Sequence, residues 1–313
     1  MPVNQAEIEF FKLMDKNQQN NPMKPIHDLS LEEYRESAAF FSEYAGKPAS
    51  VDYDNITITA RDAFDIPIRI YNNALKQKLP VLVFCPGCGY MLDFFEANAI
   101  ACSRIAEQLK IKIAIVNYRL APENPLPTAI YDVYDTVKFF ATHHKEMNID
   151  KDKIFLCGLS SGANATAIVS NLARSDDSFK IYRQILLNGN YDLIRSSHDF
   201  DDYEKEDKLL IREVINYICD RVCPNLDDRT NPLFSPYYEK DLTHLPPTTI
   251  IVSEYDGIRN DSEAYFKQLK EVGNDVESIL IPGQTHNTIL MRSVLSDGVD
   301  PATVIADVVR KHI

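Results

Sequence analysis

The clearest structural signal in this chain is a strand, a tight turn and a helix in direct succession, Lys153-Ile154-Phe155-Leu156-Cys157-Gly158-Leu159-Ser160-Ser161-Gly162-Ala163-Asn164-Ala165-Thr166-Ala167. The apolar run 154–157 predicts a strand that is buried on both faces, and the alanine-rich run predicts a helix. Between them, residues 158–162 match the pattern G-x-S-x-G. In this context the two glycines permit a turn so tight that the hydroxyl of Ser160 projects from it. We therefore predict that Ser160 is a nucleophile.

The flanking sequence extends this unit into a sheet. Short apolar runs of β-branched type alternate with helical stretches at 81–84, 113–116, 154–157, 185–187 and 249–252. Such alternation predicts right-handed crossovers and a parallel sheet with helices on both faces. Ahead of it, residues 56–59 and 66–71 alternate apolar and polar side chains, as antiparallel edge strands do. The predicted fold class is α/β with a mostly parallel central sheet.

Two further segments are expected to cover this sheet as a cap. Residues 1–47 are amphipathic and helical in pattern, and Ser30-Leu31-Glu32-Glu33 has the form of a capping box. Residues 191–243 are acidic around 199–207, helix-like over 209–222, and longer than a crossover requires. We predict an N-terminal cap segment, 1–47, and a catalytic domain, 48–313, with a cap insertion at 191–243. An ordinary long helical excursion is the alternative for this insertion.

A serine hydroxyl needs a base to take its proton and a third group to orient that base. The run Ile250-Ile251-Val252-Ser253-Glu254-Tyr255-Asp256 predicts a strand with an acidic residue at its carboxyl end, where open α/β sheets place their sites. After one more helix and strand, Pro282-Gly283-Gln284-Thr285-His286 forms a turn. We predict Asp256 as the acid and His286 as the general base.

The oxyanion of a tetrahedral intermediate needs backbone N–H donors, worth about 3–4 kcal/mol each. Pro86-Gly87-Cys88-Gly89-Tyr90 follows the first parallel strand and can supply them. We assign the amides of Cys88, Gly89 and Ser161 to an oxyanion hole. No metal and no cofactor is required by this chemistry. The C-x-x-C pattern of residues 85–88 has no second ligand pair at metal-binding spacing.

Composition narrows the partners. The net charge is −13, with 33 basic and 46 acidic residues, which disfavours nucleic acid and anionic membrane surfaces. No apolar run is long enough to predict a membrane span, and the polar start does not resemble a signal peptide. Six cysteines in such a chain are expected to be reduced thiols. A cytoplasmic location is the expectation.

Several motifs, in order, resemble the hormone-sensitive-lipase-like branch of the α/β-hydrolases. Tyr118-Arg119-Leu120-Ala121-Pro122-Glu123-Asn124-Pro125-Leu126-Pro127 is similar to the family's Y-R-L-A-P-E-x-P-x-P turn, and residues 256–261 resemble its acid motif. Ser235-Pro236 and Leu245-Pro246-Pro247-Thr248 precede the acid strand, as the family pattern expects. The resemblance implies an α/β-hydrolase fold, carboxylesterase activity on small esters with short acyl groups, and a homodimer formed through the edge of the last strand.

The chain also departs from that family. The H-G-G-G loop reads Pro86-Gly87-Cys88-Gly89, the usually acidic residue before the nucleophile is Leu159, and Ala163 replaces a glycine. The altered loop motivates one alternative, a non-catalytic small-molecule binder on the same scaffold. A second alternative is an amidase that uses the same three residues. The presence of Ser160, Asp256 and His286 together favours the esterase.

Overall fold

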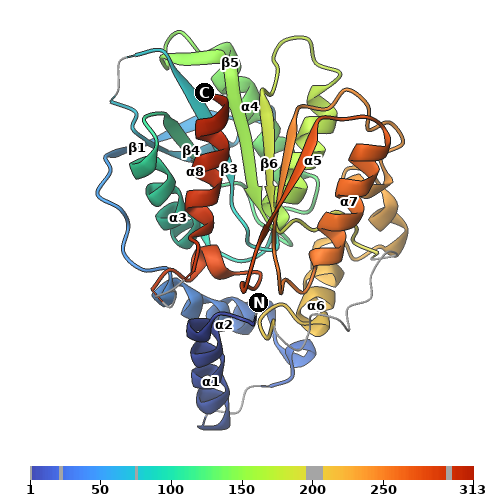
Figure 1. Cartoon of the computed structure of the whole chain (residues 1–313). Coiled ribbons are helices and arrows are strands. Elements are labelled where there is room, and N and C mark those ends of the chain that lie inside the picture. Colours follow the sequence, from blue (N-terminus) through green and yellow to red (C-terminus); the bar gives the residue numbers. More distant parts are fainter. Residues whose placement is uncertain (1, 21–23, 75–76, 195–206, 294–297) are drawn as a thin grey trace.

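The computed structural model describes residues 2–20, 24–74, 77–194, 207–293 and 298–313. A single eight-stranded sheet runs through it in the order β1-β2-β4-β3-β5-β6-β7-β8 (Figure 1). Its strands are β1 (Tyr53–Thr59), β2 (Asp65–Tyr71), β3 (Leu79–Cys85), β4 (Lys112–Val116), β5 (Ile149–Leu159), β6 (Arg183–Leu187), β7 (Thr248–Ser253) and β8 (Val276–Ile281). The predicted α/β class is confirmed.

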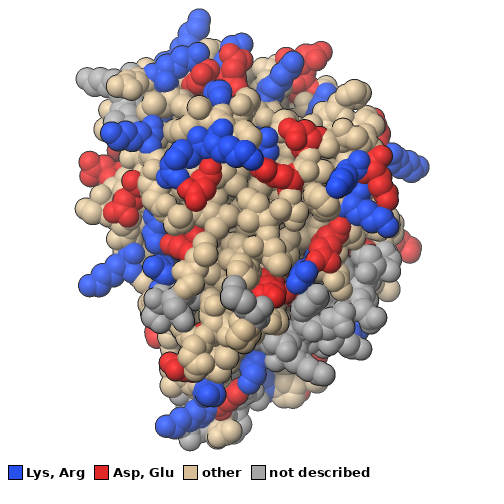
Figure 2. All heavy atoms as spheres, viewed as in Figure 1, with Lys and Arg blue, Asp and Glu red and all other residues tan. Residues whose placement is uncertain are grey.

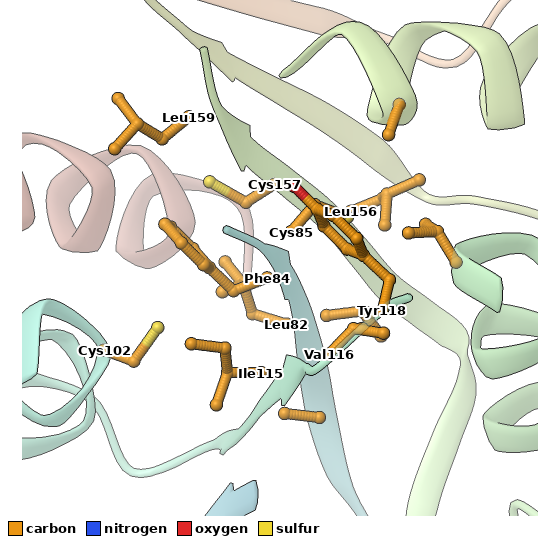
Figure 3. Close-up of a cluster of buried hydrophobic side chains, with 14 of the residues drawn as sticks. Leu82, Phe84, Cys85, Cys102, Ile115, Val116, Tyr118, Leu156, Cys157 and Leu159 are labelled. Carbon is orange, nitrogen blue, oxygen red and sulfur yellow. The ribbon is translucent and has the colours of Figure 1, made fainter. Parts of the chain in front are cut away.

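The central strands are parallel and buried on both faces, as their continuous apolar runs predict. β4, β3, β5, β6, β7 and β8 pair in parallel, whereas β1 and β2 are antiparallel at one end. Phe84 of β3 and Cys157 of β5 are paired in register, and both are fully buried. Figure 3 shows these side chains packed with Ile115 of β4 into one apolar cluster. β5 starts earlier than predicted, because Ile149 already pairs with Leu79 before a bulge.

Helices cover both faces of the sheet (Figure 1). α3 and α8 pack against each other, and α4 packs against α5, which lies on β5 and β6. α7 packs on β7 and β8 at the far end. The bounds are α3 (Phe95–Gln108), α4 (Thr128–Thr142), α5 (Ser161–Ala173), α7 (Arg259–Glu271) and α8 (Pro301–His312). This arrangement leaves the carboxyl ends of the parallel strands open for a site.

Three helices gather at that end of the sheet, α1 (Gln5–Asn20), α2 (Leu31–Tyr44) and α6 (Arg212–Val222) (Figure 1). The capping box at the start of α2 is confirmed, since the Ser30 hydroxyl accepts from the Glu33 amide and the Glu33 carboxylate accepts from the Ser30 amide. α6 begins at Arg212 rather than Leu209, because the Asp207 carboxylate accepts from the amides of Leu209 and Leu210 in a turn before it. Part of the predicted cap insertion, 195–206, lies outside the described residues.

Within the described ranges, no helix is both long and apolar enough to cross a membrane. All six cysteines are buried as free thiols. The division into an N-terminal cap segment, a catalytic domain and a cap insertion remains a prediction.

Candidate active site

Ser160 lies between β5 and α5 in a strained turn. Its φ is 54° and its ψ is −118°, a conformation that residues with a side chain rarely adopt. The flanking glycines are required by contact: a Cβ on Gly158 would lie 2.1 Å from the carbonyl oxygen of Gly162, and one on Gly162 would lie 2.0 Å from the carbonyl oxygen of Cys85. The Ser160 amide donates to the carbonyl of Leu187 in β6 at 2.9 Å. The strand-to-helix elbow is therefore present as predicted.

The structure brings Ser160, His286 and Asp256 together from three separate connections. His286 Nε2 is 2.9 Å from Ser160 Oγ, and His286 Nδ1 is 2.8 Å from Asp256 Oδ1. Asp256 is fully buried after β7, and His286 is 2% exposed after β8. An ionised carboxylate only accepts, so the ring carries its proton on Nδ1 and leaves Nε2 free to accept from the serine. This is the geometry that activation of a serine hydroxyl needs.

The electrostatics favour a histidine that can hold a proton. Burial lowers the pKa of His286, but the charge and hydrogen bond of Asp256, with the charge of Asp207, raise it above its ordinary value of 6.5 on balance. The His286 carbonyl accepts from the side-chain amide of Asn188 at 3.0 Å, which ties its loop to the end of β6.

The loop after β3 is placed to supply amides to the site. Gly89 has a φ of +57°, which suits glycine, and Ser161 is the first residue of α5. Among the described residues, no protein acceptor takes the amide hydrogen of Gly89 or Ser161. The Cys88 amide differs from the prediction, because it donates to the Ser161 hydroxyl at 3.1 Å. That bond arises because the residue after the nucleophile is a serine, whose oxygen reaches the loop.

Side chains from neighbouring elements hold this loop in place. Asn98 of α3 accepts from the Gly87 amide at 3.1 Å and donates to the Gly87 carbonyl at 3.1 Å. The Tyr118 hydroxyl donates to the Pro86 carbonyl at 2.7 Å and lies 3.1 Å from the sulfur of Cys88. The loop is thus fixed without the histidine that the family motif places at its start.

A cavity of about 40 Å³ opens beside Ser160 and Ser161. Its polar end carries Asn164 and Asn190, and its walls are otherwise apolar. The apolar walls that come from the 191–243 segment are Leu193, Leu210, Ile215, Ile218, Cys219 and Val222. A small, mostly apolar space beside Ser160 suits a short hydrocarbon group.

Three residues that the sequence does not predict contact the loop that carries His286: Asn188, Asp207 and Glu7. Asn188 directly follows β6, so its position at the carboxyl end of a predicted strand could have indicated it. Asp207 and Glu7 are fully buried against the His286 loop but lie in polar, acidic stretches. Their sequence surroundings predict solvated carboxylates, and only the tertiary fold reveals their contacts.

A serine on a strand-to-helix elbow, with its base and acid delivered by later loops at the same sheet edge, defines the serine hydrolases of the α/β-hydrolase class. Residues 82–290 match the family described as the alpha/beta hydrolase fold, and the chain belongs to this family. Its resemblance to the hormone-sensitive-lipase-like branch is confirmed.

Relatives within this family carry consistent names. The chain is 31% identical to an arylesterase of Saccharolobus solfataricus over 223 residues, which cover 71% of this chain and 72% of that protein. It is 29% identical to carboxylesterase NlhH of Mycobacterium tuberculosis over 244 residues, which cover 77% and 74%. A hyperthermophilic esterase from the archaeon Pyrobaculum calidifontis superposes with a TM-score of 0.88 at 25% identity, covering 99% of both chains.

Proposed function

We propose that this chain hydrolyses small carboxylic esters with short acyl groups through an acyl-enzyme intermediate on Ser160. The observation that carries the proposal is the continuous hydrogen-bonded row of Ser160, His286 and Asp256, with distances of 2.9 and 2.8 Å. The names of the relatives, arylesterase and carboxylesterase, support the same reaction class. The small apolar cavity beside the nucleophile supports a short acyl group.

The reaction follows from the geometry. Ser160 Oγ gives its proton to His286 Nε2 and attacks the ester carbonyl carbon, whose oxygen becomes an oxyanion within reach of the amides of Gly89 and Ser161. The C–O bond to the leaving alcohol breaks as the imidazolium returns the proton to it. Water then gives a proton to His286 and attacks the acyl carbon. The bond from that carbon to Ser160 Oγ breaks as the imidazolium returns the proton to the serine, and the carboxylic acid leaves. Asp256 keeps the ring oriented throughout.

The alternatives make different predictions. A reversible binder would not need a base within hydrogen-bonding distance of the serine, so the measured row favours catalysis over binding. An amidase would use the same residues, and matched ester and anilide substrates separate the two activities.

Homodimer formation through the edge of β8 and a cytoplasmic location remain predictions. Light scattering coupled to size-exclusion chromatography would test the dimer.

The decisive experiment compares the native chain with Ser160→Ala on p-nitrophenyl acetate and with a fluorophosphonate probe. We expect kcat to fall by about 10³–10⁶ and labelling to disappear, because Ser160 is the residue whose hydroxyl bonds to His286 Nε2 in the described part of the chain. Ser170→Ala is the matched control, since Ser170 is a buried serine of α5, the helix that follows Ser160. A native chain that neither turns over the ester nor takes the label contradicts the proposed function.

A further inference from the structure

Two carboxylates outside the triad reach the loop that carries His286. Glu7 comes from α1, and Asp207 comes from the turn before α6. Both are fully buried. Buried carboxylates are costly unless hydrogen bonds or charges compensate them, so each position needs a physical reason.

Asp207 joins three segments through its two oxygens. Its Oδ2 accepts from the His286 amide at 3.1 Å and from the Gly257 amide at 3.3 Å. Its Oδ1 accepts from the amides of Leu209 and Leu210, both at 3.1 Å. Four N–H donors occupy one side chain, which suits an ionised carboxylate because that group only accepts. The turn before α6 is thereby bonded to Gly257, the residue after Asp256, and to the backbone amide of His286.

The charge of Asp207 acts on the same histidine. The charged groups that face His286 are Asp256 from the loop after β7 and Asp207 from the cap side, and both raise the pKa of the imidazole. On balance the pKa of Asp207 is raised, because burial and the charge of Asp256 outweigh the charge of His286 and the backbone donors, which lower it. Glu7 bonds to Thr285 and Thr288 rather than to His286. Burial and, to a smaller extent, the charge of Asp207 raise the pKa of Glu7.

We infer that Asp207 is a positioning residue for ester hydrolysis, which holds the His286 loop in register with Ser160 from the cap side and whose negative charge stabilises the imidazolium formed during acyl transfer. The inference rests on the proposed function. It goes beyond the triad because it makes the cap a part of the proton-transfer machinery. A residue with a merely structural role would lower activity equally at every pH.

The test is the pH profile of kcat/KM for p-nitrophenyl acetate in the native chain, Asp207→Asn and Glu7→Gln, with active sites counted by fluorophosphonate labelling. In Asp207→Asn the acidic limb is expected to move to lower pH by about 0.5–1.5 units, because one of the two anions that favour the imidazolium is gone. Glu7→Gln is the matched control, since it neutralises a buried carboxylate of α1 that contacts the same loop through Thr285 and Thr288. Its limb is expected to stay in place.

The inference is overturned if Asp207→Asn loses activity while the acidic limb of its pH profile stays in place. It is also overturned if the acidic limb of Glu7→Gln shifts by the same amount as that of Asp207→Asn. If Asp207→Asn does not fold, Asp207→Ser provides the measurement, because its smaller side chain removes the charge and keeps an acceptor oxygen. If neither variant folds, the role is structural and the inference is wrong. A native chain without ester turnover would instead contradict the proposed function.

Discussion

Ser161 is the residue whose chemistry departs most from the expected oxyanion hole. Its hydroxyl accepts the Cys88 amide hydrogen at 3.1 Å and so occupies one of the three predicted donors. We predict that Ser161→Ala raises kcat for p-nitrophenyl acetate by up to about tenfold, because the freed amide can bind the oxyanion. The measurement is kcat per labelled active site. A fall in kcat would mean that the hydroxyl instead holds the loop in its active conformation.

The pKa of His286 sets the acidic limit of activity. In the proposed mechanism the neutral imidazole of His286 is the base, and the pKa of His286 is raised above 6.5 in the folded chain. We therefore expect kcat/KM to be half-maximal above pH 6.5 and to fall about tenfold for each further pH unit toward acid. In Asp256→Asn, the largest cause of the raised pKa is removed, so the limb moves to lower pH and kcat drops by about four orders of magnitude. A limb below pH 6.5 in the native chain contradicts this assignment.

The sequence predicts which three residues come together at the site, but not the residues that hold them there. Ser160, Asp256 and His286 follow from strand ends and chain order, and the structure places them within hydrogen-bonding distance. The occupied Cys88 amide depends on a side-chain contact between residues 73 positions apart, which no local pattern encodes. The burial of Asp207 cannot be predicted from the sequence either, because an aspartate in an acidic stretch is expected to lie on the solvated surface.

Among the elements, α6 shapes the cavity beside the nucleophile. Ile218 lines it and approaches the oxyanion loop, where a Cβ on Gly89 would lie 3.1 Å from its Cδ1. We predict that Ile218→Ala shifts the preferred substrate from acetyl toward butyryl and hexanoyl esters, because the shorter side chain enlarges the apolar space. The ratio of kcat/KM across p-nitrophenyl esters of increasing length measures this shift. Arg221→Ala, on the same helix and outside the cavity lining, is the control, and an equal change there would mean that α6 had moved as a whole.

The elements themselves were predictable to different degrees. The parallel strands were found because burial on both faces leaves continuous apolar runs. The predicted start of α6 at Leu209 is wrong, because the apolar pair Leu209 and Leu210 extends the helical pattern while the Asp207 carboxylate accepts from their amides before the helix begins. A side chain that competes for backbone donors ends or delays a helix without changing its apolar periodicity.

The chain has a net charge of −13, but its acidic side chains do not gather into one patch on the face drawn in Figure 2. Figure 2 shows acidic and basic side chains interspersed there. This distribution fits small, weakly charged substrates better than an extended charged partner.

The N-terminal helix makes contacts that connect the two ends of the chain. Phe10 and Phe11 of α1 are buried against Leu209 and Met291, and burial of each phenylalanine contributes about 1.5–3 kcal/mol. Glu7 of the same helix accepts from Thr285 and Thr288 on either side of His286. α1 therefore stabilises both the segment before α6 and the loop that carries His286.

We predict that deletion of residues 1–20 lowers kcat/KM for p-nitrophenyl acetate by at least an order of magnitude and more than Glu7→Gln does. The deletion exposes apolar surface at Leu209 and Met291, and three donors of Thr285 and Thr288 on the His286 loop lose the Glu7 carboxylate as an acceptor. The melting temperature should fall by several degrees in the same preparation. Asp15→Ala is the control, because it removes only the exposed ion pair between α1 and Lys208, and such a pair contributes about 0–1 kcal/mol. Native kcat/KM in the truncated chain would mean that α1 covers the site without ordering the His286 loop. Asp207, and not α1, would then be the contact that contributes to catalysis.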